Sequence, residues 1–101
     1  MAIAIQRSED EKELRLKIIG RLELADHADF RAAYIETDPD EVSCIVDMEE
    51  ATFIDSSTIG ALLTMRNSLG GEKAGITLAN CSPHIIKLLE ATNILRLFVI
   101  R

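Results

Sequence analysis

The sequence has little of the material from which metal sites, disulfide frameworks and base-stacking surfaces are built. It contains two cysteines, two histidines, three phenylalanines, one tyrosine and no tryptophan. Neither Cys44 nor Cys81 stands in a CxxC pair or beside a histidine, so their spacing predicts no metal site and no disulfide scaffold. We expect both to be free, buried thiols of a cytoplasmic protein.

Positive charge and long apolar runs are also scarce. There are 11 Lys and Arg against 17 Asp and Glu, a net charge of −6, which argues against nucleic-acid binding because phosphate recognition needs a basic face. No apolar run approaches the roughly 20 residues that span a bilayer. Charges also interrupt the N-terminus where a signal peptide needs its apolar stretch. We therefore expect no membrane insertion and a cytoplasmic location.

What the chain does contain is the composition of one folded domain. Of its 101 residues, 48% are hydrophobic and 28% are charged, and this length fits a single domain over residues 1–101. Residues 2–6 form an apolar run and residues 14–18 alternate apolar with basic side chains, which predicts a β-hairpin. Asp26 is placed to begin a helix to about Glu36, with an apolar face made of Phe30, Ala33 and Tyr34.

The remaining chain alternates strands with helices. We predict a central strand at residues 42–48, buried on both faces, and further strands near 76–78 and at 97–100. Helices are predicted at residues 57–69 and 83–93, and Phe53 and Ile54 are expected in the core. The order β-β-α-β-α-β-α-β predicts an α/β fold with a small mixed β-sheet.

The most informative segment is a cluster of helix-capping residues, Asp55-Ser56-Ser57-Thr58. Capping of the following helix accounts for one of these side chains, and the cluster as a whole is compatible with that simple role. Because one cap suffices, however, we expect at least one hydroxyl to remain free at the surface. A hydroxyl at a helix N-terminus is a favourable place for a phosphate, since unpaired N–H groups and the helix dipole favour an anion.

Sequence motifs typical of catalytic or metal-binding sites are weaker than this capping cluster. The sequence has no G-x-S-x-G elbow and no phosphate-binding glycine-rich loop, so a hydrolytic or nucleotide-binding domain is disfavoured. The two histidines and the nearby acidic residues are expected to be solvated, and no metal or cofactor is predicted; these residues are His27, His84, Asp47, Glu49, Glu50 and Asp55.

The segment from Phe53 to Gly60 resembles the signature of the STAS domain, as found in bacterial anti-sigma factor antagonists. That signature usually reads apolar-Asp-Ser-(Ser/Thr)-Gly-Leu-Gly. Gly20-Arg21-Leu22 resembles the family's Gly-x-Leu before the first helix, and Asn80-Cys81-Ser82-Pro83 resembles its closing strand-helix connection. The likeness covers nearly the whole chain and implies the STAS fold.

In that family the serine directly after the aspartate is phosphorylated, and this position is Ser56. The resemblance implies a protein that is not an enzyme, binds no cofactor and is a monomer when free. Unphosphorylated, it would bind and sequester an anti-sigma factor that is also a serine kinase; phosphorylation would release it, and a PP2C-type phosphatase would restore it. The implied partner surface consists of Asp55, Ser56, Ser57, Thr58, Ile59, Gly60, Leu22 and Leu24.

Thr58 departs from the signature, which usually has glycine at this position. We expect its branched side chain to lie beside Ser56 and to narrow the access of a kinase or phosphatase. The competing function is that of a non-catalytic STAS subunit of a membrane transport system, such as a phospholipid ABC importer. A structural subunit of that kind has no need of a phosphorylatable Ser56, whereas a switch requires it.

Overall fold

The N-terminal hairpin forms as predicted. In the computed structural model, which describes residues 2–101, β1 (Ile3–Arg7) pairs antiparallel with β2 (Glu13–Ile18). The Ser8 hydroxyl closes the turn by donating to the Asp10 carboxylate at 2.6 Å and accepting from the Glu13 N–H at 3.0 Å. Leu14, Leu16 and Ile18 are fully buried, as expected for alternate residues of a half-buried strand.

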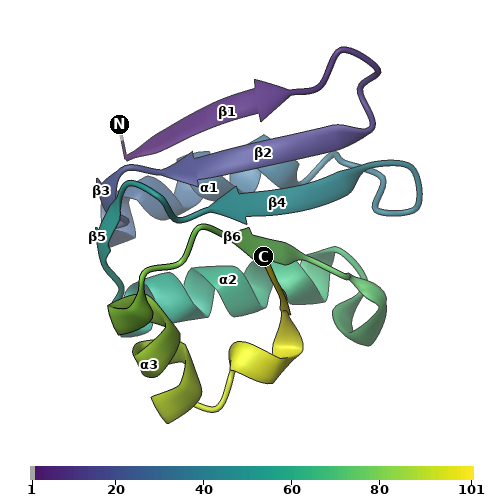
Figure 1. Cartoon of the computed structure of the whole chain (residues 1–101). Coiled ribbons are helices and arrows are strands. Elements are labelled where there is room, and N and C mark those ends of the chain that lie inside the picture. Colours follow the sequence, from purple (N-terminus) through teal and green to yellow (C-terminus); the bar gives the residue numbers. More distant parts are fainter. Residues whose placement is uncertain (1) are drawn as a thin grey trace.

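The hairpin forms one side of a five-stranded mixed sheet with the order β1-β2-β4-β6-β7 (Figure 1). β4 (Ser43–Asp47), β6 (Thr77–Ala79) and β7 (Val99–Ile100) run parallel to β2. Cys44, Ile45 and Val46 are all buried, so the prediction that β4 is covered on both faces is confirmed.

Three helices provide the crossovers between the parallel strands: α1 (His27–Tyr34), α2 (Ser56–Ser68) and α3 (Pro83–Ala91). α1 lies behind the sheet in Figure 1 and buries Phe30, Ala33 and Tyr34, as predicted. The Phe30 and Tyr34 rings meet edge to face at 5.7 Å. Ser82 caps α3 by accepting from the Ile85 N–H at 3.2 Å. No helix within residues 2–101 is both long and apolar enough to cross a membrane.

Two short strands were not predicted. β3 (Gly20–Arg21) and β5 (Ala51–Phe53) pair parallel in a separate two-stranded sheet. The Gly20 N–H donates to the Glu50 carbonyl at 2.8 Å, so the predicted polar connection after β4 is partly strand. Phe53 is 41% exposed and Ile54 only 2%, because neighbouring side chains point to opposite sides of extended backbone; the placement of Phe53 in the core is wrong.

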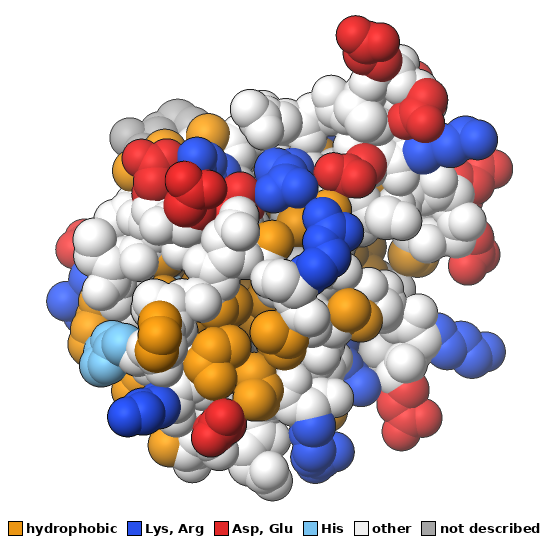
Figure 2. All heavy atoms as spheres, viewed as in Figure 1, with side chains coloured by type: hydrophobic (Ala, Val, Ile, Leu, Met, Phe, Trp, Pro, Cys, Tyr) orange, Lys and Arg blue, Asp and Glu red, His pale blue; other side chains and the backbone are white. Residues whose placement is uncertain are grey.

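The C-terminal segment also differs from the prediction. A 3-10 helix at Leu95–Leu97 replaces the start of the expected strand, and β7 is limited to Val99–Ile100. Both residues of this edge strand are more than two-fifths exposed. In Figure 2, which shows one face of the molecule, hydrophobic side chains gather in the lower half, around α3 and the C-terminal segment.

The two cysteines are free thiols with different degrees of burial. Cys44 is buried as predicted, whereas Cys81 is only half-buried. Burial raises the pKa of both thiols above the ordinary value, because a thiolate is poorly solvated in an apolar environment. Neither thiol therefore has the lowered pKa of a reactive cysteine.

Asp47 is a buried acid at the end of β4, on the same side of the strand as Ile45 and opposite Cys44 and Val46. Its carboxylate accepts from Arg15 at 2.9 Å, from the Asn80 amide at 3.1 Å and from the Glu49 N–H at 3.0 Å. Burial alone would raise the pKa of Asp47, but these hydrogen bonds outweigh it and hold that pKa below its usual range.

We predict that Asp47→Asn lowers the free energy of unfolding at pH 7 by about 2 kcal/mol, because charge-assisted hydrogen bonds are lost in a buried position. An acid with a lowered pKa in the folded state stabilises the protein above its unfolded-state pKa, and this contribution disappears as the pH falls through the folded-state value. Urea unfolding between pH 7 and pH 3 should therefore show a shallower loss of stability in the variant. Glu90→Gln, which neutralises an exposed acid on α3, is the control; equal behaviour of both variants would contradict the prediction.

Candidate functional site

The two segments of the implied partner surface come together at one end of the sheet. β3 and β5 pair so that Arg21 lies opposite Phe53, and the Thr58 hydroxyl donates to the Leu22 carbonyl at 3.2 Å. Arg21 also forms an ion pair of 2.8 Å with Asp55. We call this surface, made of residues 20–24 and 53–60, the Ser56 surface. In Figure 1 it lies at the left, where β5 leads into α2.

Asp55 holds the Ser56 surface together as the N-cap of α2. Its backbone is extended, and Oδ1 accepts from the Thr58 N–H at 2.9 Å while Oδ2 accepts from Arg21. The Thr58 N–H, followed by the Arg21 guanidinium, holds the pKa of Asp55 below its usual range. One carboxylate thus caps the helix and binds Arg21 of β3.

The three hydroxyls after Asp55 have different environments. The Ser57 hydroxyl lies 2.8 Å from Nε2 of His27, and the Thr58 hydroxyl binds the Leu22 carbonyl within the protein. Ser56 is exposed. The expected accessible hydroxyl is therefore Ser56, at the first residue of α2.

Two residues assigned to the partner surface are buried instead. Thr58 and Leu22 are both 0% exposed, so their assignment as contact residues is wrong, and their contact with each other joins α2 to the loop. Thr58 also does not narrow access to Ser56, because its side chain is enclosed by the protein. Leu24 is 78% exposed, Gly60 is exposed and Ile59 is half-buried.

The sequence did not predict the roles of three side chains at or beside the Ser56 surface, those of His27, Arg21 and Phe53. His27 is half-buried and bound to Ser57, not solvated as expected, whereas His84 is exposed. The Arg21 guanidinium lies 5.1 Å from the centre of the exposed Phe53 ring, a cation–π distance. The only available indications were the position of Arg21 after a strand-ending glycine and of Phe53 just before the capping cluster.

The contact between Ser57 and His27 has the distance of a nucleophile–base pair, but not its surroundings. Catalysis of that kind needs a group that orients the histidine and a pocket for a substrate. Within residues 2–101 no carboxylate pairs with His27, and the adjoining hollow between α1 and α2 measures about 180 Å³. In the same part of the chain, no three His, Cys, Asp or Glu residues are grouped to hold a metal ion.

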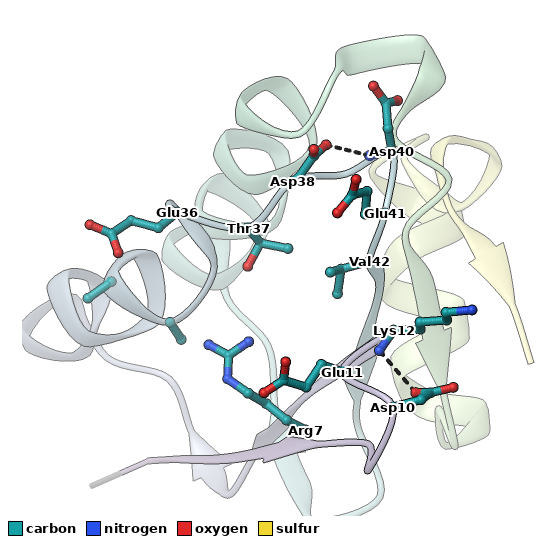
Figure 3. Close-up of a pocket in the computed structure, with 12 residues that line it drawn as sticks. Arg7, Asp10, Glu11, Lys12, Glu36, Thr37, Asp38, Asp40, Glu41 and Val42 are labelled. Carbon is teal, nitrogen blue, oxygen red and sulfur yellow. Dashed lines mark hydrogen bonds between the residues drawn. The ribbon is translucent and has the colours of Figure 1, made fainter.

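A larger groove, of about 860 Å³, lies at the opposite end of the sheet, beside the hairpin turn (Figure 3). Two of its acids serve the turns that form it: Asp10 binds Ser8 and the Lys12 N–H, and Asp38 binds the Asp40 N–H. These contacts explain Asp10 and Asp38 as turn-forming residues. The acids that line the groove are Asp10, Glu11, Glu36, Asp38, Asp40 and Glu41.

Comparison with known proteins identifies the family of the chain. A family model described as "Mlab, STAS domain" matches residues 5–99. A STAS-domain containing protein of Pseudomonas aeruginosa (strain UCBPP-PA14) is 44% identical over 100 residues, which cover 99% of both chains. The chain belongs to the STAS domain family.

Solved structures agree with this membership at the level of the fold. The STAS domain superposes on an anti-sigma-factor antagonist (STAS) domain protein from Planctomyces limnophilus with a TM-score of 0.80 and 18% identity, covering 97% of this chain and 87% of the other. It superposes on the phosphorylated form of the Bacillus cell fate determinant SpoIIAA with a TM-score of 0.71 and 21% identity, covering 99% and 91%. The predicted α/β fold is confirmed.

We predict that Thr58→Gly, which restores the usual residue of the signature, destabilises this STAS domain by about 2 kcal/mol. The variant loses a buried hydrogen bond to Leu22 and introduces glycine into the first turn of α2. Thr58→Ser keeps the hydroxyl and is the matched control, expected to lose less. Chemical unfolding of the three proteins measures the difference, and a Thr58→Gly protein as stable as the wild type would contradict the structural role of Thr58.

Proposed function

We propose that this STAS domain is a regulatory partner-switching protein controlled by phosphorylation of Ser56. The unphosphorylated form binds and sequesters an anti-sigma factor that is also a serine kinase. Phosphorylation of Ser56 releases that partner, and a PP2C-type phosphatase restores binding. The domain acts through binding and has no catalytic role of its own.

The observation that carries this proposal is the accessibility of Ser56 beside two engaged hydroxyls. Ser56 is exposed at the N-terminus of α2, while Ser57 binds His27 and Thr58 binds Leu22. A kinase must reach the hydroxyl that it phosphorylates, and Ser56 meets this requirement without any change in the fold.

Exposed apolar groups beside Ser56 support a protein partner. Leu24 and Phe53 are 78% and 41% exposed, and Gly60 lies one helical turn after Ser56 on the same side of α2. An apolar patch with a charged rim is typical of protein interfaces. The charged rim here includes Arg21 and Asp55.

Phosphorylation is expected to change binding more than folding. A phosphate adds a charge of about −1.5 to −2, which the N-terminus of α2 favours by about 0.3–1 kcal/mol at an exposed site. Asp55 and the exposed Glu49 and Glu50 oppose it, but solvent and salt screen these charges. At a fitted interface, in contrast, the same phosphate must be desolvated or clash, and the loss can reach several kcal/mol.

We predict that Ser56→Asp loses the kinase-type partner in pull-down experiments, while Ser56→Ala keeps it constitutively. Both variants should melt within a few degrees of the wild type, because position 56 is exposed. Ser43→Asp places the same charge on an exposed serine at the far end of β4 and is the control. Mass spectrometry of the captured proteins identifies what is lost.

Two outcomes would contradict this proposal. An unfolded Ser56→Asp protein would show that the charge acts on the fold, and equal capture of the kinase by the wild type and Ser56→Asp would show that position 56 does not control binding. Capture of membrane-transporter subunits by the wild type and Ser56→Asp alike would support the competing role as a transport-system subunit.

Gly60 provides a test that separates the stability of the domain from its binding to the partner. A Cβ added at Gly60 would meet no atom within 4 Å, and alanine is the better helix former by about 0.5–1 kcal/mol. We predict that Gly60→Ala raises the free energy of unfolding, and that Gly60→Gln is tolerated by the fold but weakens partner binding through its larger side chain. Chemical unfolding and titration calorimetry check both parts; Gly60→Gln binding as tightly as the wild type would place the partner elsewhere.

A further inference from the structure

Arg21 connects the features that surround Ser56. Its guanidinium binds the Asp55 carboxylate at 2.8 Å and covers the Phe53 ring at 5.1 Å, while the side chain remains 52% exposed. Lys17, a second cation near this end of the sheet, is already held by Glu50 at 2.8 Å. Arg21 is therefore an accessible cation bound directly to the residue before Ser56.

Arg21 can leave Asp55 for another anion without loss of the helix cap. Oδ1 of Asp55 accepts from the Thr58 N–H, and only Oδ2 accepts from Arg21. The cap therefore survives if Arg21 leaves. An ion pair between such exposed side chains contributes little to stability, so a stronger anion nearby can replace the carboxylate.

We propose that Arg21 is the counter-ion of phosphorylated Ser56, leaving the Asp55 carboxylate to pair with the phosphate. This proposal rests on the proposed function, in which a serine kinase transfers the γ-phosphoryl group of ATP to the Ser56 oxygen, with release of ADP and of the hydroxyl proton. The Cα atoms of Asp55 and Ser56 are about 3.8 Å apart, and the long Arg21 side chain is tethered beside them by β3.

The chemistry of the two anions favours this exchange. A phosphoserine carries more charge than a carboxylate and presents three acceptor oxygens, and a guanidinium binds such oxygens in pairs. Lys17 is held by Glu50, and Nε2 of His27 lies 2.8 Å from the Ser57 hydroxyl. The remaining charged groups on the neighbouring segments are acidic and repel the phosphate, which leaves Arg21 as its partner; these acids are Glu23, Asp26, Glu49 and Glu50. When Arg21 moves to the phosphate, Asp55 loses its cation and the position of the guanidinium over the Phe53 ring changes. Phosphorylation therefore alters three neighbouring groups of the Ser56 surface, Arg21, Asp55 and Phe53.

The test uses the full chain with phosphoserine installed at position 56 by amber-codon suppression, which needs no kinase and no partner. Titration followed by 31P NMR gives the second pKa of the phosphate, which is about 6 for an exposed phosphoserine. In the otherwise unchanged protein we expect this pKa to lie lower, and Arg21→Gln to raise it by about half a unit or more. Arg21→Lys should give an intermediate value, since it keeps the charge but not the paired donors.

Arg7→Gln removes the same charge at the hairpin end of the molecule and is the matched control, expected to leave the titration unchanged. Melting curves verify that each variant is folded. Equal phosphate pKa values with Arg21 and Arg21→Gln would overturn the role of Arg21, whatever the partner experiments show. Conversely, a phosphorylated protein that still binds its partner would overturn the switch function and leave the titration result intact, so the two failures are distinguishable.

Discussion

The Asp55 carboxylate makes the contacts on which the Ser56 surface depends. One oxygen caps α2 through the Thr58 N–H, and the other holds Arg21 of β3. Because the cap fixes the first residue of α2, it also decides which hydroxyls face inward and which face solvent. The separation of an exposed Ser56 from the engaged Ser57 and Thr58 follows from where the helix begins.

The sequence was sufficient for the elements whose residue pattern is local. The strand β2 alternates, β4 is a continuous apolar run and α2 begins at a strong N-cap, and their predicted positions agree with the structure within a few residues. The strands β3 and β5 are too short to leave a pattern, since each exists only through its pairing with the other. The misplacement of Phe53 has the same origin, because a three-residue strand does not reveal which of its side chains faces the core.

The candidate site could be predicted in outline only. The residue types of the capping cluster predicted that at least one hydroxyl would stay free, and the family resemblance singled out Ser56 and connected it with the loop around Leu22. The contacts that define the environment of each hydroxyl join residues far apart in the chain: 30 positions separate His27 from Ser57, and 36 separate Leu22 from Thr58. Hydrogen bonds of this kind depend on how α1 packs against α2, which no local pattern contains.

Because of how the strands are connected, the two ends of the molecule also form at different stages of folding. β1 and β2 are joined by a short turn, whereas each parallel pairing in the five-stranded sheet closes through a helix. Loop closure costs more entropy for a longer intervening segment, and such long-range pairings are slow to form. Arg21 and Asp55, 34 residues apart, can meet only after the crossover through α1 and β4 has closed. A nascent chain can therefore form its hairpin while Ser56 still lacks the surroundings that distinguish it from the neighbouring hydroxyls.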